Sequence, residues 1–281
     1  MPVRSIYAAL LLGAAAAPAV AQTAPDLVAK NLEARGGAAA IAAIKGLSFE
    51  GRTIFPGDFE VTYKEWRAQD GPRARDRVDL SLQGLDVIQA YDGSGAWKIN
   101  PLQGRKDAER MSADESRQLA DGSTITGPLL QARADGSTVT YLGLEDFDGT
   151  DAYKLKVAQK DGDQFVYWLD PDTFLEIKIE ETRRIRGAQQ ITETELGDYE
   201  KIAGVYFPMS VESWAQGHPN ERSRTIIATG VANPVLDDGL FNEPGQHAAA
   251  TKAAAPDASD TTPAKAGKAD AAQPSNPPKG N

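Results

Sequence analysis

Few residues in this sequence have the types and spacing that catalysis requires. Its 281 residues contain no cysteine and two histidines, His218 and His247. His218 lies in a Gly-His-Pro-Asn turn and His247 lies in a polar C-terminal stretch, so the two lack the spacing of zinc ligands. The serines have neither a G-x-S-x-G turn nor a histidine placed as a base. We therefore expect no metal and no cofactor.

The carboxylates offer one further kind of chemistry. Glu180-Glu181 and Glu193-x-Glu195 are the pairs to consider for hydrolysis, a reaction that uses paired carboxylates. Glu180 and the Glu193/Glu195 pair also fit the solvated side of an amphipathic strand, which is the commoner role of such residues. We predict that the protein is not an enzyme, with a hydrolase as the remaining alternative.

The N-terminus has the form of an export signal. Arg4 precedes an apolar stretch over 6–17, and Ala19-Val20-Ala21 matches a signal-peptidase site. A membrane anchor is the alternative, but the stretch is short for a permanent span. We expect 1–21 to be a cleavable signal peptide and the mature protein to be soluble in a bacterial periplasm.

Composition restricts the partners and the domain plan. The formal net charge of −10 disfavours binding to nucleic acid and to anionic lipid surfaces, and leaves a basic partner protein open. Without cysteine, a domain over 22–245 is held by its core alone. Residues 246–281 are rich in Ala, Pro and Lys and contain few large apolar side chains, so we predict a disordered tail.

Two regions have a helical pattern. Over 23–45 the apolar spacing predicts two short helices hinged at Gly36-Gly37. Ser112 and Glu115 have the spacing of a capping box, which predicts a helix over about 113–119. A second helix is expected after Gly127-Pro128. These last two helices are placed to lie across the sheet as a lid.

The rest of the chain alternates apolar and polar residues, the pattern of half-buried strands. Short connections between these segments predict antiparallel neighbours in sequence order. The fold class is therefore α+β, a strongly curved antiparallel sheet (an incomplete or half β-barrel) whose concave face is covered by helices. The expected strand segments are 61–66, 78–82, 85–91, 97–99, 139–141, 153–157, 165–169, 175–179, 191–199, 205–214 and 224–231.

Three motifs resemble those of the periplasmic lipoprotein carrier superfamily, the LolA/LolB-like proteins that include the outer-membrane lipoprotein-sorting proteins. They are the D-G-x-x-x-W-x-x-N-P run over 92–101, the hairpin over 162–178 and the F-x-x-P run that ends at Pro244. The resemblance implies a half-barrel over 22–245 with a cavity for acyl chains. It also implies an arginine on an early strand that holds the helical lid, for which Arg67 and Arg73 are the candidates.

Large apolar residues of the strands are the candidate ligand-binding set. The alternative is a filled core, because protein interiors normally close-pack. Each methylene removed from water contributes ~0.8 kcal/mol, so an acyl chain needs no directional polar contacts for affinity. The candidates are Trp66, Val87, Trp97, Ile99, Tyr153, Leu155, Trp168, Leu175, Ile177 and Phe207.

These observations together predict a function in transport. We expect a monomeric carrier or chaperone that binds a lipid or the acyl chains of a lipoprotein in a hydrophobic cavity. An inner-membrane transporter or an outer-membrane receptor would be its partner, and nucleic acid would not. The alternative is a non-catalytic structural or adaptor subunit of a cell-envelope complex.

Overall fold

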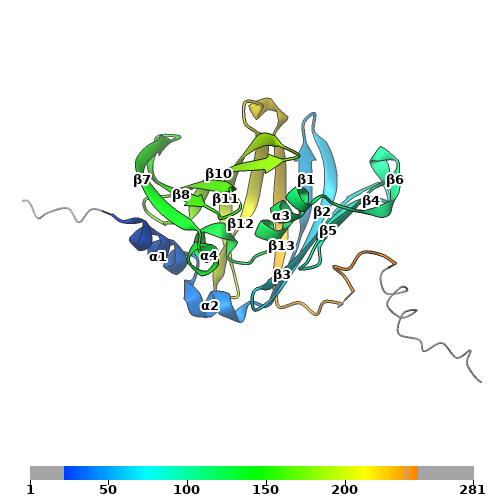
Figure 1. Ribbon diagram of the computed structural model, residues 1–281, viewed down its shortest axis with the longest axis horizontal. Coiled ribbons are helices and arrows are strands. Elements are labelled where there is room, and N and C mark those ends of the chain that lie inside the picture. Colours follow the sequence, from blue (N-terminus) through cyan, green and yellow to red (C-terminus); the bar gives the residue numbers. More distant parts are fainter. Residues whose placement is uncertain (1–21, 238, 246–281) are drawn as a thin grey trace, which may run out of the picture. The chain divides into compact units, whose positions relative to one another are not determined.

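Thirteen antiparallel strands form one sheet in the computed structural model, which describes residues 22–237 and 239–245 (Figure 1). The predicted signal peptide and the predicted tail lie outside the described residues. The strands are β1 (Gly46–Phe55), β2 (Phe59–Asp70), β3 (Arg73–Leu82), β4 (Leu85–Tyr91), β5 (Ala96–Asn100), β6 (Arg105–Arg110), β7 (Thr138–Phe147), β8 (Thr150–Ala158), β9 (Gln164–Leu169), β10 (Glu176–Ile185), β11 (Ala188–Ile202), β12 (Val205–Ala215) and β13 (Ser223–Ala232).

The strand order explains how the two ends of the chain meet in the sheet. It reads β6-β5-β4-β3-β2-β1-β13-β12-β11-β10-β9-β8-β7, so every pair in the sheet joins strands that are consecutive in the sequence, except the pair of β1 with β13. The predicted antiparallel order and the α+β class are confirmed. The sheet is open, with β6 and β7 as its edges.

Four α-helices occur in the described residues: α1 (Ala24–Ala34), α2 (Gly37–Ala43), α3 (Ala113–Gly122) and α4 (Gly127–Asp135). Thr23 caps α1 by accepting a hydrogen bond from the backbone N–H of Asp26. Gly36 separates α1 from α2 with a φ of 124°, and a Cβ there would lie 2.3 Å from the carbonyl oxygen of Gly204. Only glycine fits this hinge, which confirms the predicted break.

The capping box at the start of α3 is present as predicted. The Ser112 hydroxyl accepts from the backbone N–H of Glu115, while Glu115 accepts from the backbone N–H of Ser112 at 2.9 Å. Helix α3 runs on to Gly122, past the predicted end at residue 119, because no proline or helix-ending glycine interrupts it earlier. Gly136, in the left-handed conformation, ends α4.

Two strands were not predicted, β1 and β6. In β1 the register shifts between Glu50 and Gly51, and a Cβ on Gly51 would lie 2.1 Å from the carbonyl oxygen of Ile226. This bulge breaks the alternation that sequence patterns rely on. Strand β6 reads RKDAER, and such charged residues are typical of an edge strand that resists pairing with another chain.

All four helices pack on one side of the sheet, which we call the helix face; the other side is the opposite face. Leu27 of α1, Leu129 of α4 and Ile41 of α2 are buried against strand residues there. Helix α3 contacts β3, β4, β5 and β10, and so bridges strands from both halves of the sheet. Within the described residues, no helix is long and apolar enough to cross a membrane.

Candidate functional site

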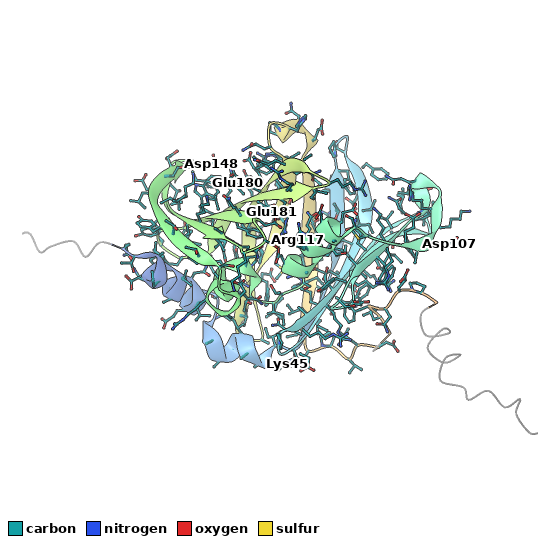
Figure 2. The ribbon with its side chains drawn as sticks, in the orientation of Figure 1. Lys45, Asp107, Arg117, Asp148, Glu180 and Glu181 are labelled. Atoms are coloured by element: carbon teal, nitrogen blue, oxygen red, sulfur yellow. The ribbon has the colours of Figure 1, made fainter. Side chains whose placement is uncertain are left out.

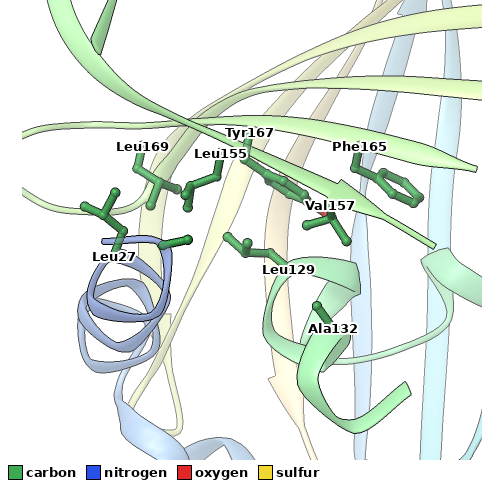
Figure 3. Packing of buried hydrophobic residues seen from close by; sticks show 9 residues of the cluster. Leu27, Leu129, Ala132, Leu155, Val157, Phe165, Tyr167 and Leu169 are labelled. Carbon is green, nitrogen blue, oxygen red and sulfur yellow. The ribbon is translucent and has the colours of Figure 1, made fainter. Parts of the chain in front are cut away.

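The first packed region of the helix face lies between α1, α4 and strands β8 and β9 (Figure 3). Leu27, Leu129 and Leu155 point toward one another there, and each is at most 1% exposed. This part of the helix face is therefore filled core. We call it the α1–α4 cluster; its buried members are Ala24, Leu27, Leu129, Ala132, Leu155, Val157, Phe165, Tyr167 and Leu169.

A second packed region lies under α2. The rings of Phe49 on β1 and Phe207 on β12 meet edge to face, with centroids 5.8 Å apart. Ile41 of α2 covers them from the helix side. We call this region the α2 cluster; its buried members are Ile41, Ile44, Leu47, Phe49, Ile125, Val205, Phe207 and Met209.

A cavity of about 330 Å³ lies on the helix side of the α2 cluster, between α2 and the link that joins α3 to α4. We call it the α2 cavity. Most of its wall is apolar, and the Gln69 side chain fixes one side by accepting a hydrogen bond from the backbone N–H of Ile125 at 3.1 Å. It is lined by Leu32, Ala38, Ile41, Ala42, Ile44, Lys45, Gln69, Gly71, Ile125, Thr126 and Leu130.

A smaller cavity of about 170 Å³ lies at the other end of the α2 cluster, over β1, β2, β12 and β13. We call it the Arg67 cavity. Phe49 and Phe207 belong to its wall, so the α2 cluster separates the two cavities. It is lined by Phe49, Tyr63, Glu65, Arg67, Phe207, Pro208, Val211, Thr225 and Ile227.

A group of ionisable side chains forms the polar end of the Arg67 cavity. Tyr63, Glu65 and Arg67 alternate along β2 and so share one face. Glu65 accepts from the Tyr63 hydroxyl and, at 2.6 Å, from Nε of Arg67. Asp76 of β3 lies 3.8 Å from the same Nε. Glu65 and Asp76 are 4% and 5% exposed, so both carboxyl groups are buried.

Burial and proximity change the protonation of this group. Burial, with the nearby Glu65 carboxylate, raises the pKa of Asp76 well above its usual value, so Asp76 keeps its proton more readily than an exposed aspartate. Burial and Glu65 likewise raise the pKa of Tyr63. Although burial alone would lower it, the two carboxyl groups raise the pKa of Arg67.

Arg183 of β10 fastens α3 to the sheet. This guanidinium is 4% exposed and donates to Asp121 of α3 at 2.8 Å, to Asp163 at 2.6 Å and to Glu181. Burial raises the pKa of Asp121, while Arg183 opposes that rise. Helix α3 has no fully buried residue, so these charged contacts carry much of its attachment.

Further ion pairs surround the same helix. Glu115 lies 3.6 Å from Lys98 of β5 and 3.1 Å from Arg186. Arg117, which projects from α3 (Figure 2), lies 3.5 Å from Asp161. Because the partners come from opposite halves of the sheet, α3 acts as an ionic bridge across the helix face.

Arg35 fastens the end of α1 in a similar way. This residue is 8% exposed; its Nε donates to the carbonyl oxygen of Tyr206 at 3.0 Å, and its Nη1 donates to Glu176 at 3.2 Å. Its Nη2 reaches the carbonyl oxygen of Ile125 at 3.5 Å. One side chain therefore ties α1 to β12, to β10 and to the wall of the α2 cavity.

The arginines that anchor the helices, Arg35 and Arg183, are not the two candidates for the lid-holding arginine. Within the described residues, Arg67 pairs with carboxylates of the sheet and Arg73 donates to the carbonyl oxygen of Asp92, and neither has an ion pair or hydrogen bond with a helix. Arg35 and Arg183 are instead buried arginines that join a helix to the sheet. Sequence reasoning missed both, although the Arg-Gly-Gly hinge at Arg35 was a usable signal.

Four of the predicted ligand-binding residues lie on the helix face. Phe207 lines the Arg67 cavity. Leu155 is fully buried in the α1–α4 cluster, and Tyr153 packs against that cluster while stacking on Phe174 at 5.7 Å. Val87 is half-buried. It pairs with Leu80, and Leu80 pairs with Tyr63, so Val87 lies on the same face of the sheet as Tyr63.

The three tryptophans among the candidates lie on the opposite face. Trp97 is fully buried there, and its Nε1 donates to the carbonyl oxygen of Phe241 at 2.8 Å. The Arg77 guanidinium lies over the rings of both Trp66 and Trp97 in cation–π contacts. Trp168 alternates with the core residues of β9 and donates to Glu145. Phe241, the first residue of the F-x-x-P run, thus lies on the opposite face beside Trp97.

The remaining three candidates are half-buried. Ile99 follows Trp97 by two positions on β5 and shares its face. Leu175 and Ile177 flank Glu176, beside the register shift between β9 and β10. The ten candidates therefore do not line one common surface, and their contact with a ligand stays a prediction.

Three of the four carboxylates considered for hydrolysis are held in ion pairs, and the fourth, Glu180, accepts a hydrogen bond from Gln216 at 3.4 Å. Glu181 accepts from Arg183, Glu193 lies 2.7 Å from Lys178, and Glu195 lies 3.0 Å from Arg222. Within the described residues, no group of three or more His, Asp or Glu side chains is placed to hold a metal ion. The arrangement of the helix face offers apolar cavities and one buried polar end, which is suited to binding.

Comparison with known proteins identifies the fold. No protein-family model and no curated protein matches the sequence. Among solved structures, a putative outer membrane lipoprotein-sorting protein domain from Vibrio parahaemolyticus superposes with a TM-score of 0.54 at 12% identity, over 78% of this chain and 97% of that one. A LolA superfamily protein from Nitrosomonas europaea gives 0.52 at 19% identity, over 79% and 98%.

A DUF1329 family protein from Desulfovibrio piger is similar to the same degree. Its TM-score is 0.55 at 12% identity, over 78% of this chain and 96% of the other. The resemblance to LolA-like proteins is therefore confirmed at the level of the fold, across nearly the whole length of each relative.

Proposed function

We propose that this protein is a non-catalytic periplasmic carrier that binds a lipid, or the acyl chains of a lipoprotein, on its helix face. The observation that carries the proposal is the apolar α2 cavity of about 330 Å³, at the place where α2 meets the α3–α4 link. The fold shared with a lipoprotein-sorting domain supports it. The sheet would bend around the helices as an incomplete barrel, with the cargo between them.

Binding on this surface rests on burial of hydrocarbon. Each methylene that leaves water contributes ~0.8 kcal/mol, so several methylenes offset the entropy lost on association. The α2 cavity lies at the lower end of the ~300–1,000 Å³ range of ligand sites. A long chain therefore needs the helices to move, and Arg183 and Arg35 hold the contacts that such movement would break.

Helix α2 is the element best suited to move. It has seven residues, five of them alanine, and Ile41 is its one buried residue. Short helices of this kind depend on tertiary packing for their stability. An acyl chain that enters beside Ala38 and Ala42 would replace solvent at the cavity wall and leave the α1–α4 cluster in place.

The adaptor alternative has one observation in its favour. The α1–α4 cluster is close-packed, with Leu155 and Leu169 fully buried, so that half of the helix face is already filled. An envelope adaptor would need no more than such a core and an acidic surface.

Lipid extraction of the full chain purified from a periplasm tests the proposal, together with titration by a fluorescent acyl probe. The carrier proposal predicts co-purifying hydrocarbon and saturable probe binding. Ala38→Phe should block the α2 cavity and weaken binding at least tenfold. Ala39→Phe is the matched control, because Ala39 is also exposed on α2 but does not line the cavity. A ligand-free protein that takes up no probe would support the adaptor.

A further inference from the structure

Arg67 lines a cavity and has donor groups for which no partner is found among the described residues. Its Nε is taken by Glu65 at 2.6 Å, with Asp76 at 3.8 Å. Within the described residues, neither Nη1 nor Nη2 of Arg67 has a hydrogen-bond partner. The side chain is 26% exposed and lines the Arg67 cavity, so a ligand can reach it. A guanidinium presents its donors in a fixed fork, and the Nη edge is free here.

The charges around Arg67 select a neutral ligand group. Glu65 already balances the guanidinium, and Tyr63 donates to the same carboxylate. A buried anion placed beside Glu65 and Asp76 would add negative charge where two carboxyl groups are already buried, which is costly at low dielectric. A neutral carbonyl oxygen accepts from the Nη groups without adding charge.

The rest of the cavity is apolar and small. Phe49, Phe207, Val211 and Ile227 provide its hydrocarbon wall. At about 170 Å³ it is similar in size to apolar cavities of ~150 Å³ that bind benzene, so it holds a short segment of chain beside the polar end. A carbonyl with a few methylenes attached matches both the volume and the chemistry.

We propose that the Arg67 cavity binds the carbonyl of an acyl ester or acyl amide, with the oxygen accepting from the Nη groups of Arg67 and the first methylenes packed against the wall that Phe49 and Phe207 form. This inference rests on the proposed carrier function and names its ligand class. Arg67 thereby selects esterified or amide-linked acyl chains over free fatty acids and over plain hydrocarbon.

Three competitors with similar chains separate these classes. Methyl octanoate, octanoate and octyl methyl ether are titrated against a fluorescent acyl probe bound to the full chain at pH 7.5. A hydrogen bond to a charged donor contributes enough for about tenfold tighter binding of the ester than of the ether, ~1.4 kcal/mol. The octanoate anion is expected to bind more weakly than the ester.

Variants assign the preference to Arg67. Arg67→Met should abolish the difference between ester and ether. If Arg67→Met alone fails to fold because Glu65 is left buried without its guanidinium, the double variant Arg67→Met/Glu65→Gln removes that carboxylate as well. It should likewise show no difference between ester and ether. Arg52→Met is the control, because Arg52 lies on neighbouring β1 in an exposed ion pair with Glu60. It should keep the wild-type preference.

Infrared spectroscopy supplies a readout that needs no variant. A ¹³C-labelled ester carbonyl should absorb at lower frequency when bound to the wild-type protein than in an alkane, because it accepts hydrogen bonds. Equal binding of ester, acid and ether, or an unshifted carbonyl band, would overturn this assignment while the carrier function stands. Absence of binding by any acyl probe would instead remove the carrier function itself.

Discussion

Replacing Arg183 by Met tests whether charged contacts hold α3 over the sheet. The change removes the guanidinium from three carboxylates, those of Asp121, Asp163 and Glu181. Removing one partner of a buried ion pair typically costs 3–5 kcal/mol, because the other charge stays buried. Asp121 and Glu181 are about a quarter exposed and can regain water, so the lower figure, ~3 kcal/mol, applies.

That loss should appear first as local opening of α3. The helix has no fully buried residue, so its detachment exposes little apolar surface. A change of ~3 kcal/mol corresponds to about a hundredfold faster amide exchange in the peptide over 113–122, measured by hydrogen–deuterium exchange and mass spectrometry. Exchange in β12 and β13 should stay close to that of the wild type.

Arg186→Met is the matched control for this experiment. Arg186 also pairs with α3, through Glu115, but its side chain is 70% exposed. A surface pair of this kind contributes ~0–1 kcal/mol, so exchange in α3 should rise by less than tenfold. If Arg183→Met leaves exchange in α3 unchanged while global stability falls, Arg183 stabilises the sheet and the ionic bridge is refuted.

Two further predictions concern stability. Leu155→Ala should lower the free energy of unfolding in urea by ~2–5 kcal/mol, because Leu155 is fully buried in the α1–α4 cluster, and should leave acyl binding per folded molecule unchanged; weaker binding without destabilisation would show an open cavity there. Hydrogen bonds from the Ser112 backbone and hydroxyl lower the pKa of Glu115 to about 2, so its contribution is present above pH 4.5 and is lost as pH falls toward 2. In thermal unfolding, Glu115→Gln should therefore destabilise the protein by ~1 kcal/mol at pH 6 and by nearly nothing at pH 2. A difference in stability between wild type and variant that stays constant with pH would contradict this.

Local sequence signals predicted the local structure well. The capping box at Ser112 and the hinge at Gly36-Gly37 depend on neighbouring residues alone, and both are present. The alternation over 153–157 gave strand β8 and its buried side. Strand β6 was missed because charged residues fill it, and no apolar alternation marks an edge strand that is protected by charge.

The face of a strand that meets the helices could not be predicted from alternation. Trp66 and Trp97 are large and apolar, yet they lie on the opposite face, where Arg77 lies over both rings and Trp97 donates to the carbonyl oxygen of Phe241. That contact joins residues 144 positions apart, and no local pattern encodes it. Glu65 and Arg67 have the period of a solvated strand, but the fold turns them toward a cavity.

The most direct test of the central claim is a crystal structure of the protein with an acyl ester that has a bromine at the end of its chain. We expect an anomalous bromine peak within the α2 cavity or the Arg67 cavity, beside Ile41 or Phe207. A bromine peak on the opposite face would contradict the carrier proposal. So would a fully occupied ester bound elsewhere, with both cavities of the helix face empty.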